Sequence, residues 1–445
     1  MEDWPEDAKK YALDDVSWTW KVLEKQEERF GGLGAFKDEA AQCRNAWALH
    51  LISVYGMRVN EERAEEWLEK VRLDAEEGKR AAKNLGILRE NGTKNVLRLR
   101  ELVDEAYEGN PPRTEKGAVS TSGETLRESG HPDLLRYAES KFSETLQTRY
   151  APIFREGRTV HPSYRTLMKT GRTSCSKPNM QNPPRAGGFR ECFEPRPGCV
   201  FVLCDYSQIE LLALAQCHIW LFGSSSIADA VNAGRDLHIE VAQRLNPEDP
   251  KAFRQFAKVA NYGFPGGLSA NAFRGYAKGF GLEVTEDEAK NIRRVWMETW
   301  PEMRKYFDWI GDETRWGNSD AVQFVSGRVR GSCSFPQYAN TLFQGLTADG
   351  ALTALSRVQT ACFVDESSPL FGARAVAFLH DEIILEAEEE KARDCAAELS
   401  RIMVAAMREY IPDVDVEAIP YLSRMWSKQA DRVVNSAGGL IPWEP

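Results

Sequence analysis

Two short apolar segments that lie far apart in the sequence both end in carboxylates. Residues 200–204 lead into Asp205, and residues 376–379 lead through His380 into Asp381. A carboxylate at the tip of a hydrophobic strand is unstable unless a cation lies against it, and hard divalent cations prefer oxygen ligands. Two such tips brought together would hold a pair of metal ions about 4 Å apart, the arrangement that supports nucleotidyl transfer. Asp205 alone is equally consistent with a helix N-cap and Asp381 with a hairpin turn, but neither interpretation explains why both strand ends are acidic.

A second set of residues combines positive charge with an aromatic ring. Arg254, Lys258 and Tyr262 are spaced four residues apart, which places them on one face of a helix. A guanidinium fork and an ammonium point charge suit the phosphates of a nucleotide, and the ring can stack on a sugar or a base. The alternative is a solvated basic stripe with a partly buried tyrosine. Residues 264–267 (FPGG) predict that this helix ends or bends sharply.

The charge of the chain is unevenly distributed. The 445 residues suit two to four subdomains, and their formal net charge of −10 by itself argues against a nucleic-acid ligand. Residues 141–190, however, hold ten basic and two acidic side chains, a net charge of +8. The same segment contains glycine, proline and asparagine residues typical of loops that reach phosphates or base edges. We therefore predict that this segment contacts a phosphate backbone, with a solvated charged face as the alternative.

The composition disfavours several other classes of protein. Apolar residues make up 42% of the chain, and no stretch of about 18 consecutive apolar residues predicts a membrane span. Residues 1–7 are acidic and lack the hydrophobic stretch of a secretory signal. The nine cysteines contain no C-x-x-C pair, which favours buried free thiols over disulfides or a zinc site. We expect a cytoplasmic protein without membrane contact, in a bacterium or in the host cell if the source is viral.

Helices and strands must position these candidate residues. The sequence pattern predicts helices over residues 5–30, 37–54, 131–150, 339–363 and 388–410, and a charged, largely helical region over 60–108. Residues 207–315 are mostly helical with breaks, residues 155–205 form short strands and turns, and a strand pair surrounds His380. Together these elements predict an α+β architecture with one small antiparallel sheet.

Six motifs, in order over about residues 40–430, resemble those of the family A DNA polymerases, the bacterial DNA polymerase I family. Residues 170–174 (TGRTS) with 178–183 (PNMQNP) resemble the template-primer-binding segment, and 205–211 (DYSQIEL) and 380–382 (HDE) resemble the two palm motifs. The others are 236–238 (DLH) and 254–263 (RQFAKVANYG) of the fingers, and 340–349 (NTLFQGLTAD), which resembles the palm helix at the primer-template minor groove. The resemblance implies a right-hand fold of palm, fingers and thumb, with the small antiparallel sheet in the palm.

The resemblance also implies a role for each site residue. Asp205 and Asp381 would hold two Mg²⁺ ions, or Mn²⁺ as a substitute, with the main-chain carbonyl of Tyr206 as a further ligand. Glu210 would exclude a ribose 2′-OH, and Lys258 would be placed to protonate the pyrophosphate leaving group. The residues expected to bind the incoming dNTP or the primer end are Arg254, Lys258, Tyr262 and His380. Those expected to contact DNA are Arg172, Gln181, Asn182, Asn340 and Gln344, the last two through minor-groove acceptors common to all base pairs.

The chain departs from the family pattern at three positions. Leu212 stands where the family usually has arginine, and Tyr262 where many members have phenylalanine. By resemblance, the Tyr262 hydroxyl lowers discrimination against dideoxynucleotides. Gly266 stands where a tyrosine usually lies on the template side of the nascent pair, which puts fidelity or template handling in doubt.

The N-terminal segment gives a further expectation. Residues 11–16 (YALDDV) resemble the last motif of the 3′–5′ exonuclease domain found upstream in this family, although a plain amphipathic helix is an equally good interpretation. One motif cannot make a two-metal nuclease. The predicted domains are an exonuclease remnant over 1–38, palm over 39–58, thumb over 59–140, palm over 141–216, fingers over 217–329 and palm over 330–445.

We therefore predict a template-directed DNA polymerase that extends a primer 3′-OH with dNTPs by a two-metal mechanism, without intrinsic proofreading. Its partners would be primer-template DNA and dNTPs, with a separate exonuclease polypeptide or a processivity factor as further candidates. One alternative is a single-subunit RNA polymerase, which must tolerate the 2′-OH that Glu210 would exclude. The other is a non-catalytic primer-template-binding protein, which would not need Asp205 and Asp381 together with Lys258.

Overall fold

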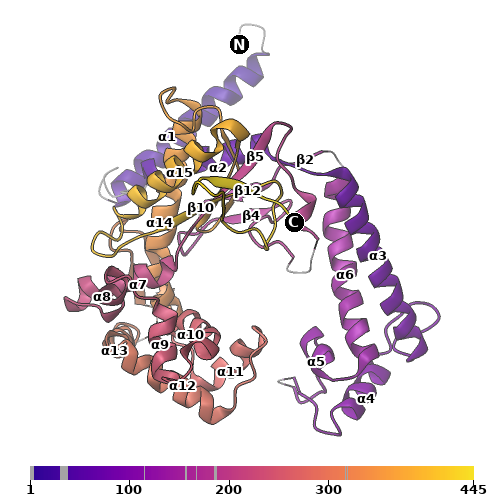
Figure 1. The fold of residues 1–445 in the computed structure, drawn as a ribbon. Coiled ribbons are helices and arrows are strands. Elements are labelled where there is room, and N and C mark those ends of the chain that lie inside the picture. Colours follow the sequence, from indigo (N-terminus) through magenta and orange to yellow (C-terminus); the bar gives the residue numbers. More distant parts are fainter. Residues whose placement is uncertain are drawn as a thin grey trace. The chain divides into compact units, whose positions relative to one another are not determined.

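The computed structural model describes residues 5–30, 39–114, 116–155, 158–166, 168–184, 188–315, 317 and 319–445 (Figure 1). The chain divides into two compact units. The first unit comprises Met1–Ala46, Lys169–Gly171 and Glu210–Asp349, and the second comprises Trp47–Met168, Arg172–Ile209 and Gly350–Pro445. Three helices contribute residues to both units: α2 (Glu39–Tyr55), α14 (Phe335–Phe363) and α7 (Ile209–Phe222), the last by its first residue alone.

A six-stranded sheet forms the centre of the second unit. Its strand order is β11-β12-β10-β5-β9-β8, and every pair is antiparallel except β10 with β12. The apolar run that follows Cys199 forms β5, which is buried along most of its length and has a partner on both sides. The strands are β5 (Cys199–Tyr206), β8 (Arg374–Leu379), β9 (Glu382–Glu388), β10 (Ala418–Ser423), β11 (Val433–Val434) and β12 (Leu440–Trp443).

Helix α15 (Ala392–Met407) packs on β5, β9 and β10. The other side of the unit's core is rich in aromatic rings, because Trp67, Phe189, Phe193 and Trp426 follow one another in edge or tilted contacts with centroids 5.4–5.7 Å apart. Buried aromatic pairs of this kind add about 0.5–1.5 kcal/mol beyond the area they bury. They join the sheet to the short elements β1 (Met57–Arg58), β2 (Thr159–Val160), β3 (Ser163–Arg165), β4 (Ser174–Ser176) and η2 (Arg190–Cys192).

Two long helices of the second unit, α3 (Glu61–Asn84) and α6 (Pro132–Arg155), pack side by side. Gly78 permits their close approach, since a Cβ there would lie 2.1 Å from the Cβ of Ser140. The shorter helices α4 (Val96–Ala106) and α5 (Gly123–Glu128) enclose a separate small apolar core that includes Leu99, Val103 and Tyr137.

The first unit is mainly helical, and a buried amide organises it. Asn261 donates from Nδ2 to the carbonyl of Leu237 (3.2 Å) and accepts at Oδ1 from the indoles of Trp296 (2.8 Å) and Trp300 (3.1 Å). These bonds fasten α10 to α9 and α12. The elements are α7 (Ile209–Phe222), α8 (Ser226–Asn232), α9 (Leu237–Leu245), α10 (Pro250–Gly263), η3 (Phe264–Gly266), α11 (Ala270–Lys278), α12 (Glu286–Thr299), α13 (Glu302–Glu313), β6 (Ser319–Val322) and β7 (Val329–Cys333).

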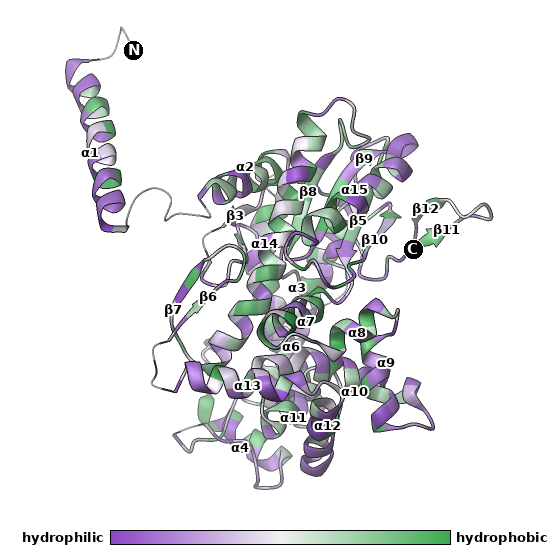
Figure 2. Cartoon of the chain, turned by 90° about the vertical axis from the view of Figure 1, so that its left-hand side faces the viewer, coloured by the Kyte–Doolittle hydropathy of each residue, from purple (hydrophilic) through white to green (hydrophobic). Residues whose placement is uncertain are grey.

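The structure confirms the predicted mixture of helices with a small sheet, with the one parallel pair as an addition. The helix predicted over 5–30 is α1 (Glu6–Phe30), which carries exposed Trp18 and Trp20. Figure 2 shows both hydrophilic and hydrophobic residues along α1, whereas α12 is mostly hydrophilic. The glycine-rich break that the sequence places at 31–34 lies outside the described residues, as do residues 1–4. The boundaries of the predicted palm, thumb and fingers stay predictions.

All nine cysteines are free, as predicted, and eight of them are buried or half-buried. In the described part of the chain, no three histidine, cysteine or acidic side chains are arranged to hold a metal ion by themselves, so an ion at the acidic strand ends described below would need further ligands from the main chain or the substrate. Nor does any described helix have the length and apolar character needed to cross a membrane.

Candidate active site

The sheet brings the two acidic strand ends together. Asp205, near the end of β5, is directly opposite Glu382, the first residue of β9. Residues facing each other in an antiparallel pair have Cα atoms about 4.5–5.5 Å apart. Asp381 precedes Glu382 in the turn between β8 and β9, so that three carboxylates gather at one end of the sheet. The juxtaposition of Asp205 and Asp381 predicted from the sequence is therefore present within one unit of the structure.

The turn that carries Asp381 is strained. His380 has a φ of +64°, and the Asp381 N–H donates to the carbonyl of Leu379 (2.7 Å), which closes a three-residue γ-turn. A positive φ is disfavoured for residues other than glycine by about 1–3 kcal/mol and recurs at functional sites. Within the described residues, the buried Nδ1 of His380 has no hydrogen-bond partner.

All three carboxyl groups have raised pKa values. Removal from water is the main cause for Asp205, followed by the charges of Asp381 and Glu382. Burial also raises the pKa of Asp381, against the opposing effect of Arg172, and raises the pKa of Glu382 to about 7. Solvent still reaches Asp205, so the upward shift of its pKa is smaller than that of a fully enclosed carboxyl group. Such mutual repulsion marks a place where a cation would be strongly stabilised.

Two arginines partly compensate this negative charge. Burial lowers the pKa of Arg172 and the charge of Asp381 opposes that shift, so this predicted DNA-contacting residue lies near the carboxylates. Arg190, which the sequence analysis did not select, acts on Glu382 and has its guanidinium 4.8 Å from the ring centroid of Trp426. Glu382 was present in the HDE motif but was not assigned a role. The position of Arg190 depends on long-range packing that no local pattern contains.

We expect the metal-free protein to lose stability as the pH rises. A carboxyl group whose pKa is raised on folding stabilises the folded state below its ordinary pKa, and this contribution is lost as the pH rises through the raised value. Between about pH 5 and pH 8, the melting temperature in EDTA should therefore fall more steeply for the wild type than for Asp205→Asn, which lacks one charge of the cluster. Excess Mg²⁺ should reduce the fall, since cations bind the ionised form. An equal fall of melting temperature with pH for the two proteins in EDTA would contradict this assignment.

Of the two residues at 181–182 that are predicted to contact DNA, one is buried and the other is exposed. Gln181 is only 5% exposed, and its Nε2 donates to Thr173 Oγ1 (2.6 Å) and to the carbonyl of Phe378 (3.3 Å). Asn182 is exposed, and its main-chain N–H donates to Asn179 Oδ1 (3.1 Å). The DNA contacts of both residues stay predictions.

In the first unit, α10 carries Arg254, Lys258 and Tyr262 as the spacing predicts. Arg254 forms an ion pair with Asp236 (2.7 Å), whose carboxylate also caps the N-terminus of α9. Lys258 is exposed, and the Tyr262 ring lies 5.8 Å from that of His238. The DLH motif thus has a physical explanation, because Asp236 caps α9 and pairs with Arg254 of α10, and His238 supplies the ring that contacts Tyr262. Helix α10 ends at Gly263, as the following FPGG predicts.

The early part of α14 carries Asn340 and Gln344, both half-buried. Asn340 Nδ2 donates to the carbonyl of Pro336 (2.8 Å), and a Cβ at Gly266 would lie 2.7 Å from the same nitrogen. The Asn340 side chain therefore occupies the space that a side chain at position 266, where the family usually has tyrosine, would need. The DNA contacts of Asn340 and Gln344 stay predictions.

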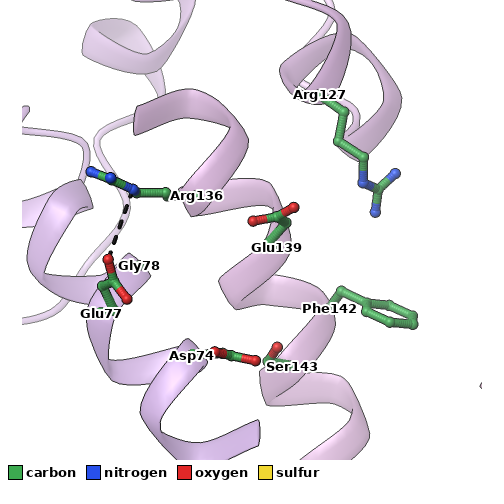
Figure 3. A pocket seen from close by; sticks show the side chains of 8 residues that line it. All are labelled: Asp74, Glu77, Gly78, Arg127, Arg136, Glu139, Phe142 and Ser143. Carbon is green, nitrogen blue, oxygen red and sulfur yellow. Dashed lines mark ion pairs between the residues drawn. The ribbon is translucent and has the colours of Figure 1, made fainter. Parts of the chain in front are cut away.

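A pocket of about 700 Å³ lies between α3, α5 and α6. Its walls carry charges of both signs, and Figure 3 shows the ion pair between Arg136 and Glu77 (3.8 Å) on one side of it. Because its charges are partly paired within the wall, this pocket differs from the convergent carboxylates of the sheet. The lining residues are Asp74, Glu77, Gly78, Arg127, Arg136, Glu139, Phe142 and Ser143.

Comparison with known proteins adds an independent observation. The model of DNA polymerase family A matches residues 96–427. The chain belongs to DNA polymerase family A. This family A chain is 28% identical over 342 residues to DNA polymerase I of Aquifex aeolicus, covering 74% of this chain and 57% of the relative. It is 30% identical over 359 residues to the thermostable DNA polymerase I of Thermus filiformis, covering 74% and 40% of the two chains. The chain thus spans roughly half the length of these relatives.

Among solved structures, the family A chain is similar to the POL domain of Pol1 from M. smegmatis, determined in complex with DNA primer-template and dNTP. The TM-score is 0.68 with 23% sequence identity, and the match covers 86% of this chain and 70% of that one. The family resemblance and the fold class predicted from the sequence are therefore confirmed.

Proposed function

We propose that this family A chain is a template-directed DNA polymerase that transfers deoxynucleotides to a primer 3′-OH and releases pyrophosphate. The observation that carries the proposal is the convergence of Asp205, Asp381 and Glu382 at one end of the sheet, in a chain of this family. A binding protein without catalysis would have no need for three carboxylates that repel one another.

The donor set of this cluster fits divalent magnesium, a hard ion that prefers carboxylate and carbonyl oxygens. Asp205, Asp381 and the main-chain carbonyl of Tyr206 would hold two Mg²⁺ ions, with Mn²⁺ as a substitute. When bound, such ions activate the attacking hydroxyl and neutralise charge on the phosphates. The raised pKa values of the two aspartates support this assignment, because burial, and for Asp205 also the charges of Asp381 and Glu382, disfavours the ionised carboxylates that a bound cation would stabilise.

The basic helix α10 supplies the groups proposed to bind the triphosphate. Arg254 offers a guanidinium fork that its ion pair with Asp236 already orients, and Lys258 extends an exposed ammonium group from the same face. Lys258 would also give a proton to the leaving pyrophosphate, while Tyr262 would pack against the sugar. Charge neutralisation and positioning provide most of the rate acceleration in phosphoryl transfer.

Other groups are proposed to contact the primer-template and to select the sugar. His380 and Arg172, which lie near Asp381, would hold the primer end, and exposed Asn182 would contact the backbone of the DNA. Gln344 and Asn340 would donate hydrogen bonds to the minor-groove acceptors common to all base pairs, as the resemblance implies. Glu210, in the first turn of α7, would exclude the ribose 2′-OH.

The proposal is tested by primer extension with dNTPs and, separately, with NTPs. We expect Mg²⁺-dependent extension that strongly favours dNTPs, and Glu210→Ala should raise ribonucleotide incorporation by about 10-fold or more because one steric and electrostatic barrier to the 2′-OH is removed. Extension by NTPs alone would favour the RNA polymerase alternative. Primer-template binding without metal-dependent pyrophosphate release would favour the non-catalytic alternative. Unchanged sugar selectivity in Glu210→Ala would show that Glu210 does not exclude the ribose 2′-OH.

We also propose that these 445 residues do not proofread. A mismatched primer incubated in the same assay without dNTPs should keep its length. Trimming that survives Asp205→Ala would contradict this statement. A separate exonuclease polypeptide and a processivity factor remain proposed partners.

A further inference from the structure

Strand β8, which leads into Asp381, is the last strand of the sheet. It pairs with β9 on one side, and no strand among the described residues pairs with its other side. The polar main-chain groups on the free side of such a strand need other partners, because a buried N–H or C=O without a hydrogen bond destabilises the fold. Phe378, three residues before Asp381, turns both of its main-chain groups toward this side.

Two side chains from one neighbouring segment supply these partners. The Phe378 N–H donates to the hydroxyl of Tyr164 (3.2 Å), and the Phe378 carbonyl accepts from Gln181 Nε2 (3.3 Å). Phe378 is 1% exposed and Gln181 is 5% exposed, so water does not compete strongly for either bond. The pair of bonds resembles the pairing that a further strand would provide.

The same segment also carries the arginine of the site. Gln181 Nε2 makes its second bond with Thr173 Oγ1 (2.6 Å), and Thr173 directly follows Arg172, whose charge acts on Asp381. The side chain of Gln181 therefore joins the strand that leads to Asp381 with the residue beside Arg172. Tyr164, on β3, is in turn paired with Cys175 of β4, so the bond from Tyr164 comes from a paired strand, and Gln181 follows β4 in the sequence.

We propose that Tyr164 and Gln181 are positioning residues. They hold the end of β8 and thereby keep the side chains of Asp381 and Arg172 in the positions that the reaction requires. This inference rests on the proposed function. The turn after Leu379 is strained at His380, and a strained turn keeps its conformation only when its surroundings fix it. The two bonds to Phe378 provide such fixation on the one side of β8 that the sheet leaves open. Gln181 acts in this account through the protein and not through contact with DNA.

The test compares Gln181→Met and Tyr164→Phe with the wild type and with Gln359→Met. Methionine is similar in length and volume to glutamine but cannot donate a hydrogen bond. Gln359 is the matched control, since its Nε2 also donates to a buried main-chain carbonyl of the same unit, that of Ala48 (2.9 Å), away from the carboxylates. Two readouts are needed: amide hydrogen exchange of residues 374–381 in the metal-free protein, and single-turnover incorporation at saturating dNTP.

We expect exchange over 374–381 to accelerate about 10-fold or more in Gln181→Met and Tyr164→Phe but not in Gln359→Met, because the Phe378 groups lose their partners. The incorporation rate should fall about 10- to 100-fold in both variants, with the dNTP KM and the primer-template Kd changed less than about 3-fold. The double variant should lose less than the product of the two single effects, because both bonds act on Phe378.

Several outcomes would overturn the proposal. They are an unchanged incorporation rate despite faster exchange, an equal loss of rate in Gln359→Met, and a loss confined to primer-template affinity, which would make Gln181 the DNA contact predicted from the sequence. Failure of the proposed function gives a different result: the wild type would incorporate no nucleotide, while the exchange experiment would still report whether Tyr164 and Gln181 hold β8.

Discussion

Replacement of Asp205 or Asp381 by alanine should abolish primer extension, with a fall in single-turnover rate of at least about 1,000-fold. A metal-bound site supplies several kcal/mol of transition-state stabilisation, and each 1.36 kcal/mol corresponds to a factor of ten in rate. The two aspartates lie at adjoining strand ends, and the charge of Asp381 raises the pKa of Asp205, so both contribute negative charge to one site. Either substitution should therefore have nearly the full effect.

The measurement is single-turnover extension in Mg²⁺, together with fluorescence anisotropy of labelled primer-template. DNA affinity should change by less than about 3-fold, because the cationic groups of the chain carry that interaction. Asp365→Ala is the control: Asp365 is an exposed turn aspartate of the same unit, hydrogen-bonded to Ser367, and its loss should leave the rate unchanged. An Asp205→Ala or Asp381→Ala variant that retains a tenth of the wild-type rate would refute the metal assignment.

Glu386→Ala should lower the free energy of unfolding of the second unit by about 3–5 kcal/mol, since it leaves a partly buried arginine without its carboxylate. Glu386 is 2% exposed on β9 and accepts from the Tyr55 hydroxyl (2.7 Å), the Arg196 N–H (2.9 Å) and the Arg196 guanidinium (3.1 Å). Arg196 also lies 3.9 Å from the centroid of the Tyr55 ring. Burial is the main cause of the raised pKa of Tyr55, and its bond to Glu386 adds to it. Removing the acceptor leaves several polar groups unsatisfied at once.

Urea unfolding followed by tryptophan fluorescence measures this effect. The matched control is Glu389→Ala, three residues along, whose carboxylate pairs with Arg424 (2.6 Å) where both side chains are more than 40% exposed. An exposed pair contributes about 0–1 kcal/mol, so the control should unfold close to the wild type. Equal destabilisation by both substitutions would show that burial does not determine the strength of this interaction.

The sequence identified the helices and the acidic strand ends because both depend on local patterns. The apolar runs before Asp205 and around His380 form neighbouring strands of one sheet, and the four-residue spacing of Arg254, Lys258 and Tyr262 forms one face of α10. The DLH motif was also found, although its reason, the Asp236 cap and ion pair, became visible only with the fold in place.

Other features of the site could not be predicted, because they depend on contacts between residues far apart in the chain. Arg190 and Glu382 interact across nearly two hundred residues, and no periodicity marks either of them. Gln181 belonged to a recognised motif, yet its burial against Phe378 follows from where β8 lies at the sheet edge. The parallel pairing of β10 with β12 likewise has no local signal, since both strands are short.

The left-handed backbone of His380 limits how this protein can be engineered. Glycine adopts a positive φ without steric conflict, and asparagine tolerates it, so a screen that rewards heat resistance alone should enrich those residues at position 380. Such variants would gain durability and lose the imidazole from the neighbourhood of Arg172. Libraries intended to yield a robust and active enzyme should therefore keep this histidine fixed and diversify surfaces distant from the acidic strand ends.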